Sequence, residues 1–181
     1  MNVELRRKLF HVFSILLWLL PLFLLPKPLL LLLCLLVILL NLSVVFKLGK
    51  DRLKPIYDLI YYFERESNRE RPSIQALWLN LGLFLSFLFF PKECSAVGVV
   101  ITAVGDGFAG IVGYHFGKTK IGNKSLEGAL AFFVSTSLVL FPFLGSKAFL
   151  IALVGTLVEL FSKRIDDNFL LPLVGSLVAC L

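Results

Sequence analysis

Long apolar runs separated by short polar connections make up most of this chain. Residues 29–40 are apolar at every position, so a helix formed there has no polar face, which is typical of a helix surrounded by lipid. A membrane-spanning helix needs roughly 20 apolar residues. By that measure the runs predict six or seven spans, because the last two runs are short. They cover residues 9–25, 28–46, 74–90, 96–116, 126–144, 148–161 and 169–181.

The composition also indicates a membrane protein. Hydrophobic residues occupy 58% of the 181 positions, above the roughly 45–50% of soluble domains, and the mean hydropathy is +0.90. We therefore predict an all-α integral membrane protein in which residues 1–181 form one helical bundle. Arg6, Arg7 and Lys8 before an apolar run resemble the start of a signal peptide. No small-x-small cleavage site follows them, so we interpret the first run as a retained helix.

The basic residues are distributed unevenly between the two ends of the predicted spans. If the N-terminus is inside, only Lys27, Lys92 and Lys147 fall in outer loops, and the other Lys and Arg residues fall on the inner side. Cytoplasmic loops carry such an excess of positive charge. We therefore expect a cytoplasmic N-terminus and an external C-terminus. The net charge of +6 then reflects topology and gives no indication of nucleic-acid binding.

The cysteines suggest no special chemistry. Cys34, Cys94 and Cys180 are odd in number and widely spaced, which predicts neither a disulfide framework nor a metal site. We expect them to serve as packing residues.

Residues 47–73 form the longest polar segment, and we expect this segment in the cytoplasm. Apolar residues recur in it at helical spacing, which predicts an amphipathic helix. The apolar stripe consists of Leu53, Ile56, Tyr57, Ile60 and Tyr61. Two interpretations fit this segment: a helix that lies on the inner membrane surface, and a lid or gate through which a lipid substrate enters.

A carboxylate inside the fourth predicted span is the most informative feature of the chain. A charge at the centre of a membrane helix costs roughly 2.5–3.5 kcal/mol on insertion scales, which favours a functional role for Asp106. Gly110, Gly113 and Gly117 share its helical face. Small residues at this spacing pack helices closely, within one chain or between two chains of a homodimer. Beside a carboxylate they also leave room for a phosphate chain and its metal ion.

The loop at residues 118–125 has features of a phosphate-binding site. Ser125 suits a helix N-cap, and a helix that begins there directs free backbone N–H groups toward Lys124 and the loop. An ordinary positively charged inner loop is the alternative interpretation. Residues 113–119 are one residue too short for a Walker A loop, and no strand precedes them. The nucleotide-binding candidates are Gly110, Gly113, Gly117, Lys118, Lys120, Lys124, Ser125, Glu127 and Gly128.

A second acidic cluster lies near the end of the chain. Glu159 closes one apolar run, and Asp166, Asp167 and Asn168 precede the next. On the predicted topology these residues reach the same face as Asp106. Because Mg²⁺ prefers a few carboxylates together with phosphate oxygens and water, Asp106, Glu159 and Asp167 are the expected metal ligands and catalytic residues. In the alternative interpretation Asp166 or Asn168 only caps the last helix, and Glu159 pairs with the lysine four residues later.

Three stretches of the chain resemble motifs of the polyprenol kinase family. This family includes dolichol, phytol and farnesol kinases and the CTP-dependent diacylglycerol kinase of yeast type. Residues 7–11, RKLFH, resemble its R-K-x-x-H motif and add Arg7, Lys8 and His11 to the candidates. Residues 105–128 resemble its D-x-x-A/G…G…G…K-S-x-E-G region, and residues 159–173 resemble its E…D-D-N-x-x-x-P-L ending.

The resemblance implies a membrane-embedded kinase that transfers the γ-phosphate of CTP to a lipid alcohol at the cytoplasmic face, with Mg²⁺ as cofactor. The residues leave the choice between CTP and ATP open. They also leave open whether the acceptor is a polyprenol, phytol, farnesol or diacylglycerol. A phosphatidate cytidylyltransferase-like enzyme and a small membrane transporter are the alternatives. A transporter is disfavoured because the sequence contains no inverted repeat.

Overall fold

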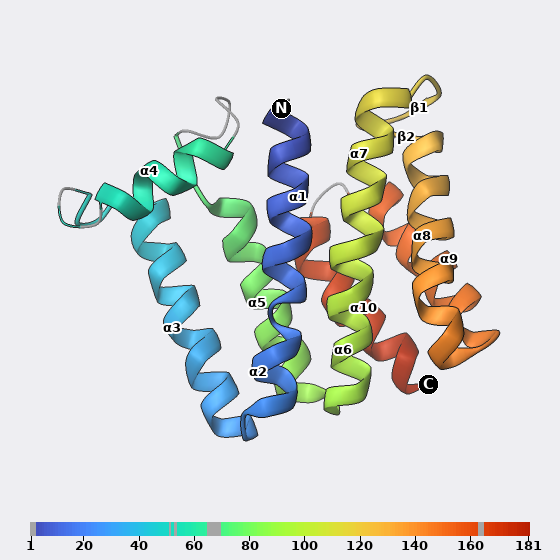
Figure 1. Ribbon diagram of the computed structural model, residues 1–181, viewed down its shortest axis with the longest axis horizontal. Coiled ribbons are helices and arrows are strands. Elements are labelled where there is room, and N and C mark those ends of the chain that lie inside the picture. The colour runs from blue at the N-terminus through green and yellow to red at the C-terminus, as the bar shows by residue number, and fades with distance from the viewer. Residues whose placement is uncertain (1–2, 51, 53, 65–69, 163–164) are drawn as a thin grey trace.

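The computed structural model describes residues 3–50, 52, 54–64, 70–162 and 165–181, most of which are helical (Figure 1). The helices are α1 (Val3–Leu16), α2 (Leu19–Leu24), α3 (Lys27–Val45), α4 (Lys54–Phe63), α5 (Ile74–Phe89), α6 (Lys92–Val100), α7 (Gly107–Phe116), α8 (Leu126–Leu144), α9 (Lys147–Phe161) and α10 (Asp167–Cys180). A π-helical segment, η2 (Ile101–Asp106), joins α6 to α7. A short antiparallel hairpin of β1 (Lys120–Ile121) and β2 (Lys124–Ser125) precedes α8.

Each predicted apolar run is helical, which confirms the all-α fold class. Among the described residues, four stretches are long and apolar enough to cross a membrane: Glu4–Leu24, Lys27–Val45, Lys92–Phe116 and Leu126–Leu144. Helices α5, α9 and α10 have 16, 15 and 14 residues, fewer than the roughly 20 of a typical crossing. The count of six or seven spans and the orientation of the N-terminus therefore stay predictions.

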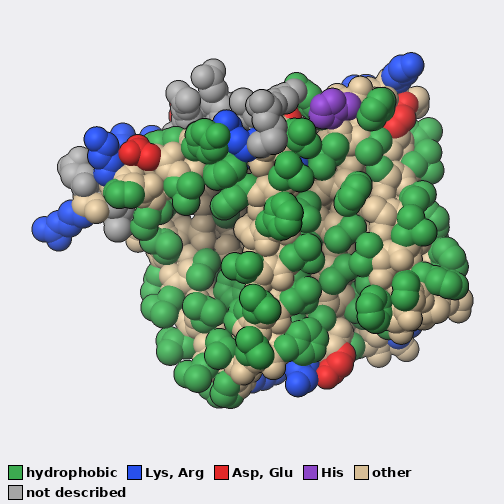
Figure 2. Space-filling view, in the orientation of Figure 1, with side chains coloured by type: hydrophobic (Ala, Val, Ile, Leu, Met, Phe, Trp, Pro, Cys, Tyr) green, Lys and Arg blue, Asp and Glu red, His purple; other side chains and the backbone are tan. Residues whose placement is uncertain are grey.

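The helices pack as a bundle with an apolar interior and an apolar outer surface. Helix α10 packs against α5, α6 and α9, and α8 packs against α7 and α9. Leu83 and Phe87 belong to one buried cluster, and Phe132, Ile151 and Leu171 belong to a second. In Figure 2 apolar side chains cover most of the visible lateral surface, and charged side chains gather near its upper and lower edges. A bundle surrounded by lipid requires this distribution, because hydrocarbon accommodates apolar side chains and excludes charged ones.

The glycines of α7 and α8 allow close contact between these two helices. A Cβ on Gly128 would lie 2.9 Å from the carbonyl oxygen of Ala109, and a Cβ on Gly113 would lie 3.1 Å from Ser125 Oγ. The glycines at these positions therefore let two helices of the same chain pack closely. At Gly110 the missing side chain makes room for Lys8 of α1. The homodimer stays a prediction.

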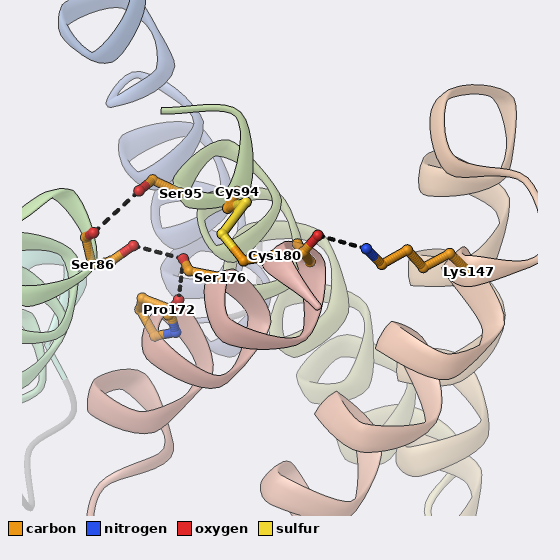
Figure 3. Close-up of a disulfide and its surroundings, with 8 residues drawn as sticks. Ser86, Cys94, Ser95, Lys147, Pro172, Ser176 and Cys180 are labelled. Carbon is orange, nitrogen blue, oxygen red and sulfur yellow. Dashed lines mark hydrogen bonds between the residues drawn. A yellow bond between two sulfur atoms is a disulfide. The ribbon is translucent and has the colours of Figure 1, made fainter. Parts of the chain in front are cut away.

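Cys94 and Cys180 form a disulfide, so the expectation that the cysteines serve only as packing residues was wrong. The bond joins the start of α6 to the end of α10 across 86 residues (Figure 3). These helices are antiparallel, because a Cβ on Gly98, one turn after Cys94, would lie 2.4 Å from Ser176 Oγ, one turn before Cys180. Spacing along the chain cannot reveal the pair, since only this packing brings the two Cα atoms to 5.5 Å. Cys34 is buried and free, as expected of a packing residue.

Helix α4 lies at the end of the bundle that carries the N-terminus (Figure 1). Its Phe63 ring stacks on Phe10 of α1 with the ring centroids 4.2 Å apart. Tyr57 of the predicted apolar stripe is buried, whereas Leu53 lies outside the described residues. The predicted helix is thus present, and its two functional interpretations stay predictions.

Candidate active site

Residues at one end of the bundle line a cavity of about 1010 Å³. This end carries the N-terminus and the hairpin (Figure 1). The walls of the cavity come from α1, α5, the end of η2, α7, the hairpin, the start of α8, the end of α9 with the loop after it, and the start of α10. Most residues selected from the sequence line this cavity. They are Arg7, Lys8, His11, Asp106, Gly110, Gly113, Lys120, Lys124, Ser125, Gly128, Glu159, Asp166, Asp167 and Asn168.

Three sequence candidates are not among the lining residues: Gly117, Lys118 and Glu127. Glu127 accepts hydrogen bonds from the backbone N–H of Thr119 at 3.0 and 3.3 Å, which ties the start of α8 to the residue before the hairpin. A Cβ on Gly117 would lie 2.7 Å from Ser125 Oγ, so this glycine allows the chain to pass close to the start of α8. Lys118 is exposed. Nucleotide binding by these three residues stays a prediction.

Three carboxylates meet in the cavity from elements that are distant in sequence. Asp106 ends η2, Glu159 lies in the last turn of α9, and Asp167 begins α10. One oxygen of each carboxylate lies within 4.8 Å of the others. Asp106 and Glu159 are each 4% exposed. Like charges buried this close together are unfavourable unless cations compensate for them.

Two side chains of α1 contact Asp106, and Lys8 supplies the compensating positive charge. The Oδ2 atom of Asp106 lies 2.7 Å from Lys8 Nζ and 2.9 Å from His11 Nε2. Lys8 and His11 are three positions apart and therefore lie on the same face of α1. Gly110 makes this approach possible, because a Cβ there would lie 2.1 Å from Lys8 Cε. The R-K-x-x-H stretch thus binds the carboxylate of the fourth predicted span.

Lys124 compensates the other two carboxylates. Its Nζ lies 2.7 Å from Glu159 Oε1 and 2.6 Å from Asp167 Oδ2. The hairpin turn directs Lys124 into the cavity, and Gly122 supplies the left-handed conformation that this turn needs, with φ of 62°. Burial lowers the pKa of Lys124, but Asp167, Asp106 and Glu159 outweigh this effect and raise it above its usual range. The ammonium therefore stays charged and holds α9 and α10 together.

The two helix N-termini at the cavity are capped as the local sequence predicts. Ser125 Oγ accepts a hydrogen bond from the N–H of Gly128 at 3.1 Å, and Asp166 Oδ1 accepts one from the N–H of Asn168 at 2.9 Å. The hydrogen bond to Asn168 confirms capping by Asp166. Burial raises the pKa of the Asp166 carboxyl. The capping coexists with the acidic cluster, because the neighbouring Asp167 binds Lys124.

The oxygen atoms in the cavity are suitable ligands for a divalent cation. Glu159 Oε2 and Asn168 Oδ1 are buried and have no hydrogen-bond partner within the described part of the chain. Buried acceptors without a partner are costly, and carboxylate and amide oxygens are the ligands that Mg²⁺ prefers. Asp106, Glu159 and Asp167 can supply such ligands together. The alternative pairing of Glu159 with Lys163 lies outside the described residues.

Several residues that line the cavity were missed by sequence reasoning, and two of them come from α5. Gln75 and Trp78 line the cavity from α5. Gln75 Oε1 accepts a hydrogen bond from Arg7 Nη1 at 3.1 Å. A glutamine at the start of an apolar run is a signal that could have indicated Gln75. Trp78 offers no such signal, because aromatic residues are ordinary in membrane spans.

The chain is similar to several curated proteins. An uncharacterized protein of Methanocaldococcus jannaschii is 36% identical over 129 residues, which are 68% of this chain and 65% of that protein. The probable chloroplastic phytol kinase of Triticum aestivum is 34% identical over 147 residues, 68% of this chain and 49% of that one. Dolichol kinase of Schizosaccharomyces pombe is 37% identical over 103 residues, 49% of this chain and 20% of that one. No family model and no solved structure match the chain.

The fold and the cavity define a helical membrane protein whose acidic and basic side chains converge at one end of the bundle. The chain is a relative of the polyprenol kinases, since proteins named phytol kinase and dolichol kinase are 31–37% identical to it. This finding confirms the resemblance to this family that the sequence indicated. The chain spans about half the length of the phytol kinases and a fifth of the dolichol kinase.

Proposed function

We propose that the protein is a membrane-embedded kinase that transfers the γ-phosphate of CTP, or of another nucleoside triphosphate, to a lipid alcohol. The convergence of Asp106, Glu159 and Asp167 with Lys8 and Lys124 in one cavity carries this proposal. Phosphoryl transfer needs positioning and charge neutralisation more than covalent help from the protein. Acidic groups for a metal ion and lysines for phosphate oxygens are the side chains that this chemistry requires.

In this proposal Asp106, Glu159 and Asp167 hold Mg²⁺, which neutralises charge on the nucleotide phosphates. Lys124 forms ion pairs with two of these carboxylates. When a cation binds the carboxylates, the ammonium is placed to bind phosphate oxygens in their stead. The N–H groups at the start of α8 lie beside it and attract phosphate as well. The proton of the acceptor alcohol passes to a carboxylate within hydrogen-bond reach of its hydroxyl.

Two observations support a cytoplasmic position for this cavity. The hairpin lysines and the basic start of α1 lie at the cavity end of the bundle, as the positive-inside rule expects of a cytoplasmic face. The Cys94–Cys180 disulfide lies at the start of α6 and the end of α10, whereas the cavity lies at the start of α10. Disulfides persist in oxidising compartments, so the disulfide end is the proposed external end.

The test uses the purified protein in nanodiscs with CTP labelled at the γ-phosphate and Mg²⁺. Farnesol, phytol and diacylglycerol serve as separate acceptors, and γ-labelled ATP is the donor control. We expect label to enter the lipid fraction with at least one acceptor and to be lost when EDTA removes the metal. Label in pyrophosphate with phosphatidate as acceptor would instead identify a cytidylyltransferase. Absence of any nucleotide-dependent product or binding would contradict both enzymes.

A further inference from the structure

An apolar groove lies beside the cavity, between the end of α9 and the start of α10. Its volume is about 630 Å³, within the roughly 300–1,000 Å³ of typical ligand pockets. The residues that line it include Leu157, Val158, Phe161, Ser162, Ile165 and Leu170. The side chains of the groove are therefore apolar except for the hydroxyl of Ser162. This hydroxyl donates a hydrogen bond to the Val158 carbonyl at 2.5 Å.

The groove and the cavity adjoin each other. Ser162 and Ile165 line both of them. The end of α9 thus presents two faces: Glu159 is buried toward the carboxylate cluster, whereas Leu157 and Phe161 on the groove are 45% and 63% exposed. A polar compartment and an apolar one therefore meet at this end of α9, as an amphiphilic ligand requires.

We propose that this groove binds the hydrocarbon tail of the lipid alcohol while the hydroxyl lies in the cavity near Glu159 and Asp167. The inference rests on the proposed kinase function and deepens it by locating the acceptor. Membrane lipid contacts apolar side chains over the rest of the lateral surface as well. At this groove, however, the apolar lining borders the polar cavity at Ser162 and Ile165, so a tail bound here would place its own hydroxyl close to the carboxylates.

The kinetic test compares Leu157→Trp, which fills the groove, with Leu153→Trp as its matched control. Leu153 lies one turn earlier on α9, has a similar exposure of 49%, and is not among the groove residues. With Leu157→Trp we expect the KM for phytol to rise about tenfold, because lost apolar contacts act mainly on binding, while kcat and the KM for the shorter geraniol change little. Leu153→Trp should leave all these values near wild type. Leu157→Phe is the second variant if the tryptophan lowers the yield of folded protein.

A labelling test needs no catalysis. A farnesol analogue with a photoactivatable diazirine on its tail is bound to the protein in nanodiscs without nucleotide, and adducts are mapped by mass spectrometry. We expect adducts on residues 157–170 that excess farnesol prevents, that Leu157→Trp reduces, and that Leu153→Trp leaves unchanged. Adducts spread evenly over the lateral surface, or equal effects of both variants, would show that ordinary membrane lipid occupies the groove and would overturn the inference.

The two tests separate this inference from the kinase proposal. If geraniol and phytol are phosphorylated but Leu157→Trp leaves their KM ratio unchanged, the groove assignment is wrong and the kinase function stands. If no alcohol is phosphorylated but farnesol still protects the groove from labelling, tail binding is supported and the kinase function is contradicted.

Discussion

At the scale of single residues, the site consists of buried and half-buried charges that compensate one another. Asp106 is paired with Lys8 and His11, and Lys124 is paired with Glu159 and Asp167. Buried ion pairs add little net stability compared with apolar packing, because desolvation of the charges offsets their attraction. Their retention in an otherwise apolar bundle is therefore better explained by the chemistry of the cavity than by folding.

The first residue-scale prediction concerns Asp106. In Asp106→Asn the carboxylate becomes an amide of the same shape, and we expect lipid phosphorylation to fall about 10²-fold or more, because a group that stabilises charge during transfer is lost. The variant leaves Lys8 buried without a counter-charge, so it should also lower the Tm. The γ-labelled CTP assay and a thermal unfolding curve measure the two effects.

The double variant Asp106→Asn/Lys8→Met separates chemistry from stability. It removes both charges of the pair, so the Tm should recover toward that of wild type while phosphorylation stays low. Recovery of activity in the double variant would mean that Asp106 serves only as the structural partner of Lys8.

The second residue-scale prediction concerns Lys124, with Lys118 as its matched control on the same loop. Lys124→Gln should raise the KM for the nucleotide about tenfold, because a charged phosphate contact is lost. Lys118→Gln should raise it less, since Lys118 is not among the cavity residues, and an equal rise would support the predicted nucleotide contact of Lys118. Without nucleotide, Mg²⁺ should raise the Tm of Lys124→Gln more than that of wild type, since the ammonium no longer competes for Glu159 and Asp167. A Tm that Mg²⁺ leaves unchanged in both proteins would contradict the metal site.

At the scale of elements, glycines decide how closely helices approach and which side chains fit between them. Gly113 and Gly128 lie where α7 meets α8, and Gly110 lies where Lys8 of α1 crosses α7. The same stripe of small residues thus has two roles: it packs α7 against α8, and it admits a lysine to the carboxylate of Asp106. Sequence spacing alone does not distinguish these roles.

The element-scale prediction compares Gly128→Ala with Gly110→Ala. At Gly128 the new Cβ would press on the backbone oxygen of Ala109, which cannot move freely, so we expect a loss of about 1–3 kcal/mol in the free energy of unfolding. At Gly110 it would press on the flexible end of Lys8. The lysine should therefore turn away from Asp106, with a large loss of activity. The Tm should fall less than in Gly128→Ala, because no backbone atom has to move and His11 still contacts the carboxylate. A larger loss of stability in Gly110→Ala than in Gly128→Ala would contradict this account.

At the scale of the whole molecule, the bundle separates two chemically different ends. One end holds the cavity, the hairpin and the N-terminus, and the other holds the disulfide and the C-terminus (Figure 1). Buried hydroxyls also gather at the disulfide end, where Ser86 Oγ and Ser176 Oγ lie 2.6 Å apart (Figure 3). Among the described residues, no acidic cluster comparable to that of the cavity lies at the disulfide end.

The whole-molecule prediction concerns the disulfide and the orientation together. In a Cys34→Ser background, the remaining cysteines of the protein should react with an impermeant maleimide on intact cells only after reduction. The reason is that Cys94 and Cys180 are bonded on the oxidising side. Cys94→Ser should lower the free energy of unfolding by roughly 2–4 kcal/mol, since the bond closes a long loop. Phosphorylation should persist at temperatures where the variant is folded. Two thiols that react before reduction would contradict the bond, and thiols that an impermeant maleimide cannot reach even after reduction would contradict the proposed orientation.

The sequence by itself determined the features that depend on local physics. Apolar runs had to become helices, because lipid offers no hydrogen-bond partners to the backbone, and Ser125 and Asp166 became N-caps because each bonds an N–H two or three residues away. It also selected most of the residues of the cavity, since charges inside apolar runs are conspicuous. The family motifs at residues 7–11 and 159–173 were recognisable for the same reason.

Only the tertiary structure decided which of these residues act together. Lys8 meets Asp106 across 98 positions, Cys94 meets Cys180 across 86, and Lys124 meets Asp167 across 43. No local preference encodes such pairs, because each depends on the crossing of helices whose packing involves many side chains at once. The groove beside α9 has the same origin: its residues look like any lipid-facing surface until α10 is placed against them.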